Sequence, residues 1–295
     1  MKSIALALPL SALLLCAGAT AWAQDADADA QQAFLKQLNF REGDFNIATA
    51  NATVHVRNGF HYLDAGDSRK VLEQLWGNPP DDSVLGMLVP DEDGLVGEHS
   101  WAVVLTYSDD GYVSDEDAAK IDYDDLLKDM QKEMVNENAT REDAGYGRLD
   151  LIGWATPPRY DASSKKLHWA KELAFDGNAE HTLNYDVRAL GRRGYLSMNA
   201  VADVSDLERV KTGMENVMQM TEFNAGERYA DYDSGSDKVA GYGLAALVGG
   251  AVAAKTGLLA KLFVALMAAK KLVFVGLAAA AAAIKGFFGK KKDPQ

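Results

Sequence analysis

The sequence predicts an α+β protein: an antiparallel meander of strands with packed helices, followed by C-terminal transmembrane or amphipathic helices. Residues 182–189 alternate polar and apolar side chains, which is typical of a strand, whereas residues 123–134 place apolar side chains at helical spacing. The composition, 48% hydrophobic and 25% charged, is that of an ordinary globular protein. Because the predicted helices lie apart from the strands in sequence, an α+β fold is favoured over a doubly wound sheet.

The N-terminus has the pattern of a secretory signal peptide. Lys2 precedes a short apolar run over residues 4–15, and a small-residue cleavage site ends at Ala23. The run is shorter than the roughly 20 residues that a membrane-spanning helix needs. We therefore expect residues 1–23 to be a signal peptide, with an uncleaved anchor as the alternative, and residues 24–39 to be a solvated leader.

Cysteine and histidine usage limits the chemistry of the chain. The only cysteine, Cys16, lies inside the predicted signal peptide, so the mature chain is expected to lack disulfides, thiol catalysis and cysteine-ligated metals. The histidines form no recognised ligand pair, and no metal or cofactor is predicted. His55 and His61 flank a predicted turn and are a candidate metal site, with ordinary surface or half-buried histidines as the favoured interpretation.

Three helices are predicted within residues 40–238, which we expect to form one acidic extracytoplasmic α+β domain. Asp67 can cap the first helix and Asp122 the second, because a side-chain oxygen at the N-cap accepts from free backbone amides. The third opens with Ser205 and has Glu208 three residues later, which is the spacing of a capping box. The apolar sides of all three are predicted to face the core.

Five strands are predicted between these helices, at residues 101–107, 149–155, 167–175, 182–189 and 195–201. Pro157 and Pro158 are expected to end the second strand. Short turns separate the last three, which therefore form consecutive antiparallel neighbours. The alternation in the fourth predicts one buried face and one face exposed to water.

Residues 239–295 are predicted to be a membrane anchor with a basic end. Lysines interrupt the apolar sequence, so a crossing from Tyr242 to Ala260, or from Leu272 to Gly289, keeps them near a membrane face. A soluble helical hairpin packed on the body is the alternative. Small residues at nearly helical spacing also allow close packing with a protein partner or a second copy, through Gly243, Ala246, Gly249 and Gly250.

Charge is divided unevenly along the chain. Residues 239–295 carry eight lysines and one aspartate, although the whole chain has a net charge of −13 at pH 7. A body this acidic disfavours nucleic acid, whereas a basic tail suits an anionic membrane surface. The expected partner is the lipid bilayer. The expected location is the bacterial inner membrane, with the body on the periplasmic side and the C-terminus in the cytoplasm.

Arginines at a predicted tight turn form the first candidate contact site. Arg192 and Arg193 lie within the turn, and Arg188 precedes it closely. Guanidinium groups suit phosphate or carboxylate, so these residues can contact an anion or a partner. The alternative is a hairpin turn with solvated arginines.

Aromatic residues form the second candidate, a surface made by Trp154, Tyr160 and Trp169. Such rings can stack on sugars, but core packing is the favoured interpretation.

The acids at 115–117 are interpreted as residues at a helix start, with calcium ligation as the alternative. No catalytic motif is recognisable, and the catalytic residues, if any, are not identified.

Short clusters along the body also resemble a known family. They are Trp76-Gly77-Asn78-Pro79-Pro80, Gly153-Trp154-Ala155 with Pro158, Tyr160 and Asp161, Leu167 with Trp169-Ala170-Lys171, Leu183-Asn184-Tyr185 with Arg188 and Leu190-Gly191-Arg192, Phe223 with Gly226 and Arg228-Tyr229-Ala230-Asp231, and Asp237-Lys238 with Ala240 and Tyr242-Gly243-Leu244. Together they resemble the bacterial uncharacterised membrane-anchored protein family, a domain of unknown function. The resemblance runs from about Phe40 into the tail and implies export and membrane attachment, but no activity, substrate or catalytic residue.

The sequence leaves two functions open. The first is a non-enzymatic binding or assembly component of the cell envelope. The alternative is a periplasmic hydrolase or carbohydrate-binding module that uses acidic and aromatic residues. An open cleft with facing carboxylates would favour the alternative, and a closed core with an exposed apolar patch would favour the first.

Overall fold

The computed structural model describes residues 30–249, except 79, 92–93, 98, 144–146 and 177–178. The predicted signal peptide and the tail after Gly249 therefore lie outside the described residues. Residues 1–39 form a unit of their own, of which a short helix over residues 30–35 is described. The second unit begins at Phe40.

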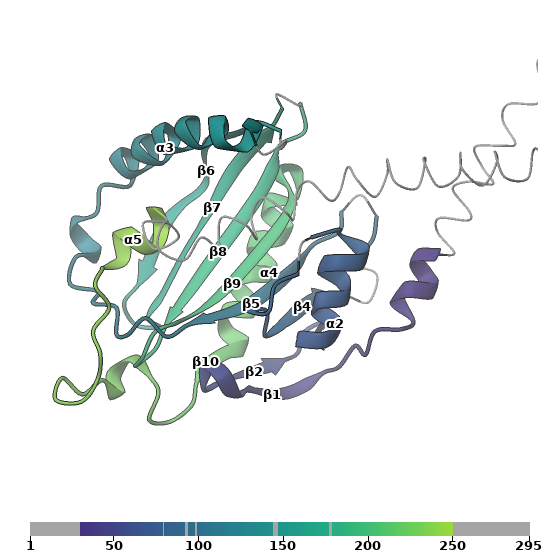
Figure 1. Cartoon of the computed structure of the whole chain (residues 1–295). Helices are drawn as coiled ribbons and strands as arrows, with labels where there is room; N and C mark the ends of the chain where they lie inside the picture. The colour runs from purple at the N-terminus through teal and green to yellow at the C-terminus, as the bar shows by residue number, and fades with distance from the viewer. Residues whose placement is uncertain are drawn as a thin grey trace, which may run out of the picture. The chain divides into compact units, whose positions relative to one another are not determined.

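Two antiparallel sheets form this unit (Figure 1). The larger has seven strands in the order β3 (Phe60–Asp64), β4 (Gly86–Pro90), β5 (Ala102–Ser108), β9 (Tyr195–Asp203), β8 (Thr182–Leu190), β7 (Lys166–Phe175) and β6 (Leu149–Asp161). The smaller has the order β1 (Gly43–Ile47), β2 (Ala52–Val56) and β10 (Thr221–Phe223). Strands β6 to β9 pair consecutively, so the predicted antiparallel meander and the α+β class are confirmed.

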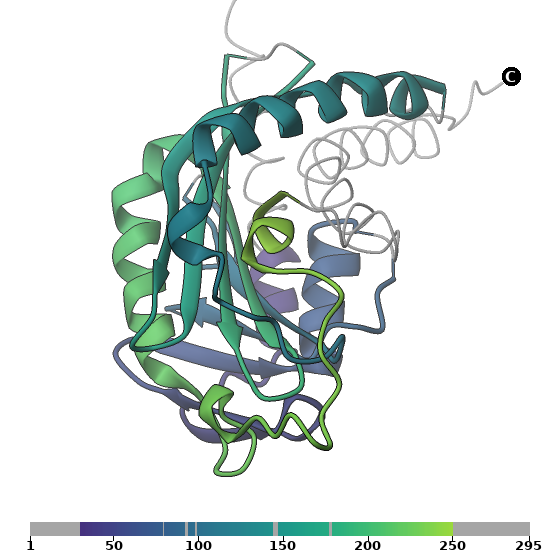
Figure 2. The same cartoon turned by 90° about the vertical axis from the view of Figure 1, so that its left-hand side faces the viewer.

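Helix α4 (Leu207–Met220) covers one face of the larger sheet, as Figures 1 and 2 show. Its buried Val210, Met214 and Val217 belong to the same core cluster as Tyr185 and the other alternate residues of β8. A Cβ atom at Gly213 would lie 2.4 Å from Cη2 of Trp101. Glycine is therefore required where α4 crosses this indole ring.

Helices α2 (Ala65–Lys70), α3 (Tyr123–Asp143) and α5 (Leu244–Gly249) lie on the other side of the sheet (Figures 1 and 2). A π-helical turn over Val71–Leu75 continues α2. Apolar residues of α3 pack on β6 and β7 in a separate small cluster, which contains Leu127, Met130, Met134, Leu149, Leu151 and Leu173. The helical spacing predicted for residues 123–134 thus forms a core face, as expected.

The helix starts differ in part from the prediction. Asp122 caps α3, because its Oδ1 accepts from the amides of Asp124 and Asp125, both at 3.0 Å. Asp67 is not the cap of α2: Asp64 accepts from the amides of Gly66 and Asp67, while the Asp67 carboxylate binds Lys70. The sequence places the first cap three residues too late, because Asp64 and Asp67 both fit the local pattern of an N-cap residue.

The predicted capping box at the third helix is also wrong. Asp203 Oδ1 accepts from the amide of Ser205 at 2.8 Å, and a 3-10 turn over Val204–Asp206 then leads into α4. Ser205 is thus inside the turn and not its cap. An aspartate at the end of β9 reaches these amides first, so the extra turn shifts the helix start to Leu207.

Two strand predictions need correction. Strand β6 does not end at Pro157 and Pro158 but continues to Asp161, with register shifts along its pairing with β7. Pro157 and Pro158 lie in the register shift between Thr156 and Arg159, where β6 does not pair with β7. Proline is tolerated at such an irregularity of an edge strand. Strand β8 has no water-exposed face: all nine of its residues are buried, since β8 lies between β7 and β9 and both of its faces are covered.

The start of the predicted anchor packs into the body. Leu244, Leu247 and Val248 are buried in one cluster with Tyr195 and Tyr229. The body therefore continues past residue 238, to Gly249 at least. Within the described part of the chain, no helix is long and apolar enough to span a bilayer. The transmembrane helices predicted beyond that point fall on residues that the structure does not describe.

Candidate functional site

A charged cluster is buried on the face of the large sheet opposite α4. Asp186 on β8 is 3% exposed, and its neighbours across the strands are Trp169 on β7 and Asn199 on β9. Arg188 Nη1 lies 3.0 Å from Asp186 Oδ1, and Lys171 Nζ lies 3.5 Å from Asp186 Oδ2. Asn199 Nδ2 donates to Asp186 Oδ1 at 2.9 Å. We call Lys171, Asp186, Arg188 and Asn199 the β8 cluster.

The ionisation of the β8 cluster depends on its burial and on its pairing. Burial alone would raise the pKa of Asp186, but Arg188 and Lys171 outweigh it and hold that pKa below its usual value. Burial lowers the pKa of Lys171, and the Asp186 carboxylate opposes this effect. With one carboxylate between two basic groups, the cluster has a net positive charge when all three are ionised.

Unused hydrogen-bonding groups adjoin the β8 cluster. Asn184, the strand neighbour of Lys171, has no exposed surface, and neither its Oδ1 nor its Nδ2 has a partner among the described residues. Nε1 of Trp169 is likewise unpaired in the described structure. A buried polar group without a partner costs about 1–3 kcal/mol. The Asn184 amide can therefore donate a hydrogen bond to, and accept one from, a polar group placed beside it.

The structure does not bring the three candidate arginines together. Arg188 is buried in the β8 cluster, where its guanidinium lies over the rings of Trp169 and Tyr195. Arg192 makes a two-point contact with Asp237, at 2.7 and 3.1 Å, and Arg193 Nη2 lies 3.1 Å from Glu227 Oε1. Hydrogen bonding to Arg192 holds the pKa of Asp237 below its usual value. An anion at this turn would compete with acids of the chain itself.

The three candidate aromatic residues pack around one apolar cluster of the body. Trp169 is 1% exposed, so its ring offers no face to a ligand. Trp154 is half-buried, and its Nε1 donates to the carbonyl of Tyr123 at 3.2 Å. Tyr160 is half-buried and donates to Asp115 Oδ2 at 2.6 Å. Their geometry is that of core packing.

Asp115 links three segments that lie far apart in sequence. Its carboxylate accepts from the hydroxyls of Tyr160 and Tyr229 at 2.6 and 3.0 Å, and from Lys165 at 2.8 Å. Burial opposes ionisation, but these three donors hold the pKa of Asp115 below its usual value, while burial and the carboxylate raise the pKa of both tyrosines. Sequence reasoning assigned the acids at 115–117 to a helix start, and no local signal marks their distant partners.

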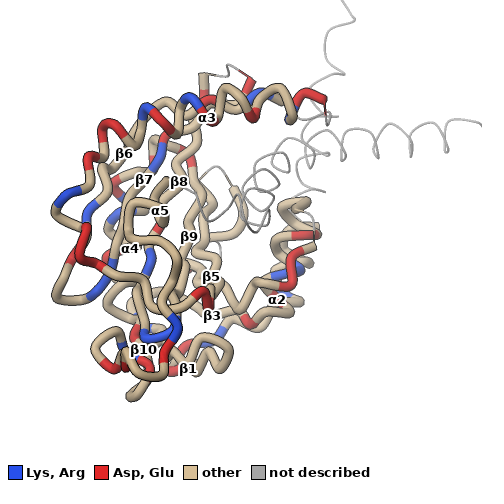
Figure 3. Tube along the Cα trace, turned by 60° about the vertical axis from the view of Figure 1, so that its left-hand side comes forward, with Lys and Arg blue, Asp and Glu red and all other residues tan. Residues whose placement is uncertain are grey.

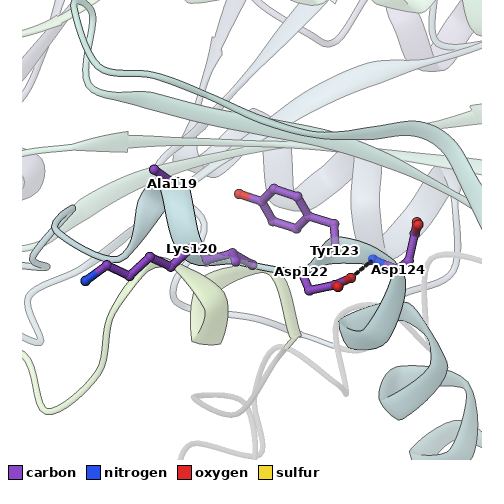
Figure 4. Close-up of a pocket in the computed structure, with 6 residues that line it drawn as sticks. Ala119, Lys120, Asp122, Tyr123 and Asp124 are labelled. Carbon is purple, nitrogen blue, oxygen red and sulfur yellow. Dashed lines mark hydrogen bonds between the residues drawn. The ribbon is translucent and has the colours of Figure 1, made fainter.

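A shallow pocket of about 460 Å³ lies at the start of α3 (Figure 4). Residues 119–124 line it, and the Asp122 carboxylate points at the amide of Asp124. The amides that would bind an anion at this helix end are therefore occupied by the protein's own acid. Acidic and basic positions then alternate along α3 (Figure 3), as on a solvated helix face.

The histidines of the predicted turn lie on different sheets. His55 on β2 has Asp44 Oδ1 at 2.9 Å and Glu222 Oε1 at 3.3 Å, and the hydrogen bond to Asp44 raises its pKa. His61 on β3 has its nearest carboxylate at 3.6 Å, from Glu42. Within the described residues, no group of three or more potential ligands is placed to hold a metal ion.

Comparison with known proteins gives a family and distant structural likenesses. Residues 39–281 match the family described as "Protein of unknown function (DUF2167)". The solution structure of cyanobacterial PsbP (CyanoP) from Synechocystis sp. PCC 6803 is 11% identical, with a TM-score of 0.33, covering 63% of this chain and 92% of that chain.

The Ran-binding protein Mog1p of Saccharomyces cerevisiae and a mutant of Mog1 are each 13% identical, with a TM-score of 0.33. Each match covers 63% of this chain and 96% of the other. At these scores no property of those proteins is transferred to this chain. No curated protein matches the sequence.

Proposed function

This chain belongs to DUF2167, a family of unknown function, and we propose that it is a membrane-anchored protein of the bacterial envelope. In this proposal the body faces the periplasm and the C-terminus is cytoplasmic. The protein acts as a non-enzymatic component that binds a partner or assembles with other copies. The signal-peptide pattern at residues 1–23 and the apolar, lysine-rich tail support export and attachment.

The separation of charge along the chain is the observation that carries the proposal. The tail has eight lysines and one aspartate, whereas the chain as a whole has a net charge of −13. An acidic body is repelled by an anionic bilayer, and a basic apolar tail is attracted to one. Since α5 is buried in the body, the proposal places the crossing at Leu272 to Gly289 rather than at Tyr242 to Ala260.

A topology experiment on the full-length chain tests attachment. A reporter that is active only in the cytoplasm is fused after Gln295, and a second copy is fused after Gly249 in a truncated chain. The first fusion is expected to be active in cells and to stay in the membrane fraction after alkaline washing, and the second to be inactive and soluble. A silent fusion at Gln295, or a full-length chain in the soluble fraction with Met1 still attached, contradicts the proposal.

Light scattering on the detergent-solubilised chain tests assembly. Gly243, Ala246 and Gly249 lie in or beside α5, which packs in the body, so the proposal assigns assembly to the Gly/Ala-rich sequence beyond Gly249. The full-length protein is therefore expected to be an oligomer and the chain ending at Gly249 a monomer. A monomeric full-length protein that purifies without a partner would contradict the assembly role.

The hydrolase or sugar-binding alternative gains no support from Trp169, which is buried under Arg188.

A further inference from the structure

A cavity of about 300 Å³ lies where the two sheets meet. It is lined by the turn from Ser163 to Lys166, the end of β8, strand β10 and residues 228–230. Its size is at the lower end of small-molecule sites. Ala189, Leu190, Phe223 and Tyr229 give it apolar walls, so the cavity suits a small ligand with an apolar part.

Two basic groups at the cavity have no carboxylate partner among the described residues. Lys166 Nζ donates to the carbonyls of Met218 and Thr221, the latter at 2.8 Å. An ammonium group has three hydrogens, so one donor remains for a ligand. Arg228 donates through Nε to the carbonyl of Phe223 at 3.3 Å, which leaves the outer edge of its guanidinium for another acceptor.

The acids around the cavity are bound to other groups. Glu222 lines the cavity as well, and its Oε1 lies 3.3 Å from His55 Nε2. Asp161 accepts from Ser163 and Ser164, and Asp115 accepts from Lys165. Among the described residues, neither Lys166 nor Arg228 forms an ion pair with any of these acids.

We propose that this cavity binds a small anion, a carboxylate or a phosphate attached to a small apolar group. Arg228 engages two oxygens of the anion, and Lys166 contributes its third hydrogen. The apolar walls hold the attached group. Burial lowers the pKa of Lys166, and the charges of Glu222 and Asp161 act in the opposite direction. A bound anion would raise this pKa and so favour the ammonium form. This inference does not depend on the location of the protein.

Calorimetric titration of the full-length, detergent-solubilised chain tests the site. The probes are N-acetylalanine, its uncharged amide and inorganic phosphate. N-acetylalanine is expected to bind and the amide is not. If phosphate binds as well as N-acetylalanine, or instead of it, the result shows which kind of anion the cavity prefers, and the assignment of the cavity as an anion site still holds. If neither anion binds, the proposal is wrong.

Variants locate the binding. Arg228→Gln is expected to weaken anion binding by about tenfold or more, the effect of losing one charge-assisted contact. Ala230→Glu adds a carboxylate at an exposed lining position without removing a contact of Arg228, and it is expected to weaken anion binding as well. It therefore tests the site even where Arg228→Gln folds poorly. Arg159→Gln is the matched control, because Arg159 is exposed and lies outside the cavity. An equal loss in Arg159→Gln, or none in the first two, would overturn the assignment.

Discussion

Asp186 and Arg188 stand two residues apart on β8, and therefore on the same face of the sheet, where Arg188 Nη1 lies 3.0 Å from Asp186 Oδ1. Lys171, from the neighbouring strand, completes the arrangement around the same carboxylate. A buried carboxylate with two basic neighbours makes the fold sensitive to the loss of the acid, because both cations would stay buried without it.

Asp186→Asn is expected to lower the free energy of unfolding by about 3–5 kcal/mol, the cost of breaking a buried ion pair. Urea unfolding of the full-length protein measures this change. The control is Asp150→Asn, which removes a partly exposed partner of Arg148 and should cost less than about 1 kcal/mol. Equal effects of the two variants would show that burial adds nothing to the Asp186 interaction.

Asn184→Leu is expected to stabilise the protein by about 1–3 kcal/mol, because it removes a buried amide that has no partner among the described residues. The matched variant Asn138→Leu should have the opposite effect. The Asn138 side chain donates to the carbonyl of Leu149 and accepts from its amide, both at 2.9 Å. A loss of stability in Asn184→Leu would show that the native amide is bonded by a group beyond the described residues.

The Asp115 interactions should make stability depend on acid. Since the folded-state pKa of Asp115 lies below its ordinary value of 3.8, its contribution is present above that value and is lost as the pH falls through the folded-state pKa. Unfolding free energies measured from neutral to acid pH are therefore expected to fall less steeply below about pH 4 in Asp115→Asn than in the native chain. Parallel curves for the two proteins would contradict this.

Gly213→Ala is expected to destabilise the protein by about 1–3 kcal/mol, although alanine is the better helix former. The added Cβ would lie 2.4 Å from the indole of Trp101, which is packed edge-on against Phe60 and cannot easily withdraw. Thermal unfolding checks this. Gly241→Ala, where a Cβ would meet nothing within 4 Å, should leave the midpoint unchanged.

The candidate site was only partly visible in the sequence. Arg188 and Trp169 were singled out, but as members of different groups, and Asp186, Lys171 and Asn184 were not assigned to any site. The reason is physical: Lys171 and Asn199 lie 15 and 13 positions from Asp186, and only the pairing of β8 with β7 and β9 makes them its neighbours. The pairing of Arg192 with Asp237 likewise spans 45 positions.

The sequence by itself determined what depends on short-range pattern. The alternation in residues 182–189, the turns between the last strands and the apolar spacing from Tyr123 were enough for the meander and for α3, because backbone periodicity acts over a few residues. The uneven distribution of lysines and acids was equally a property of the sequence alone.

Only the tertiary structure decided which acid caps a helix and which polar residues are buried. Asp64 rather than Asp67 reaches the free amides of α2, and the polar residues of β8 lie inside because both faces of that strand are covered. Such outcomes depend on distances between elements that are remote in sequence. The local sequence pattern holds no information on those distances. In a different tertiary arrangement Asp67 could cap a helix, and the polar residues of β8 could face solvent.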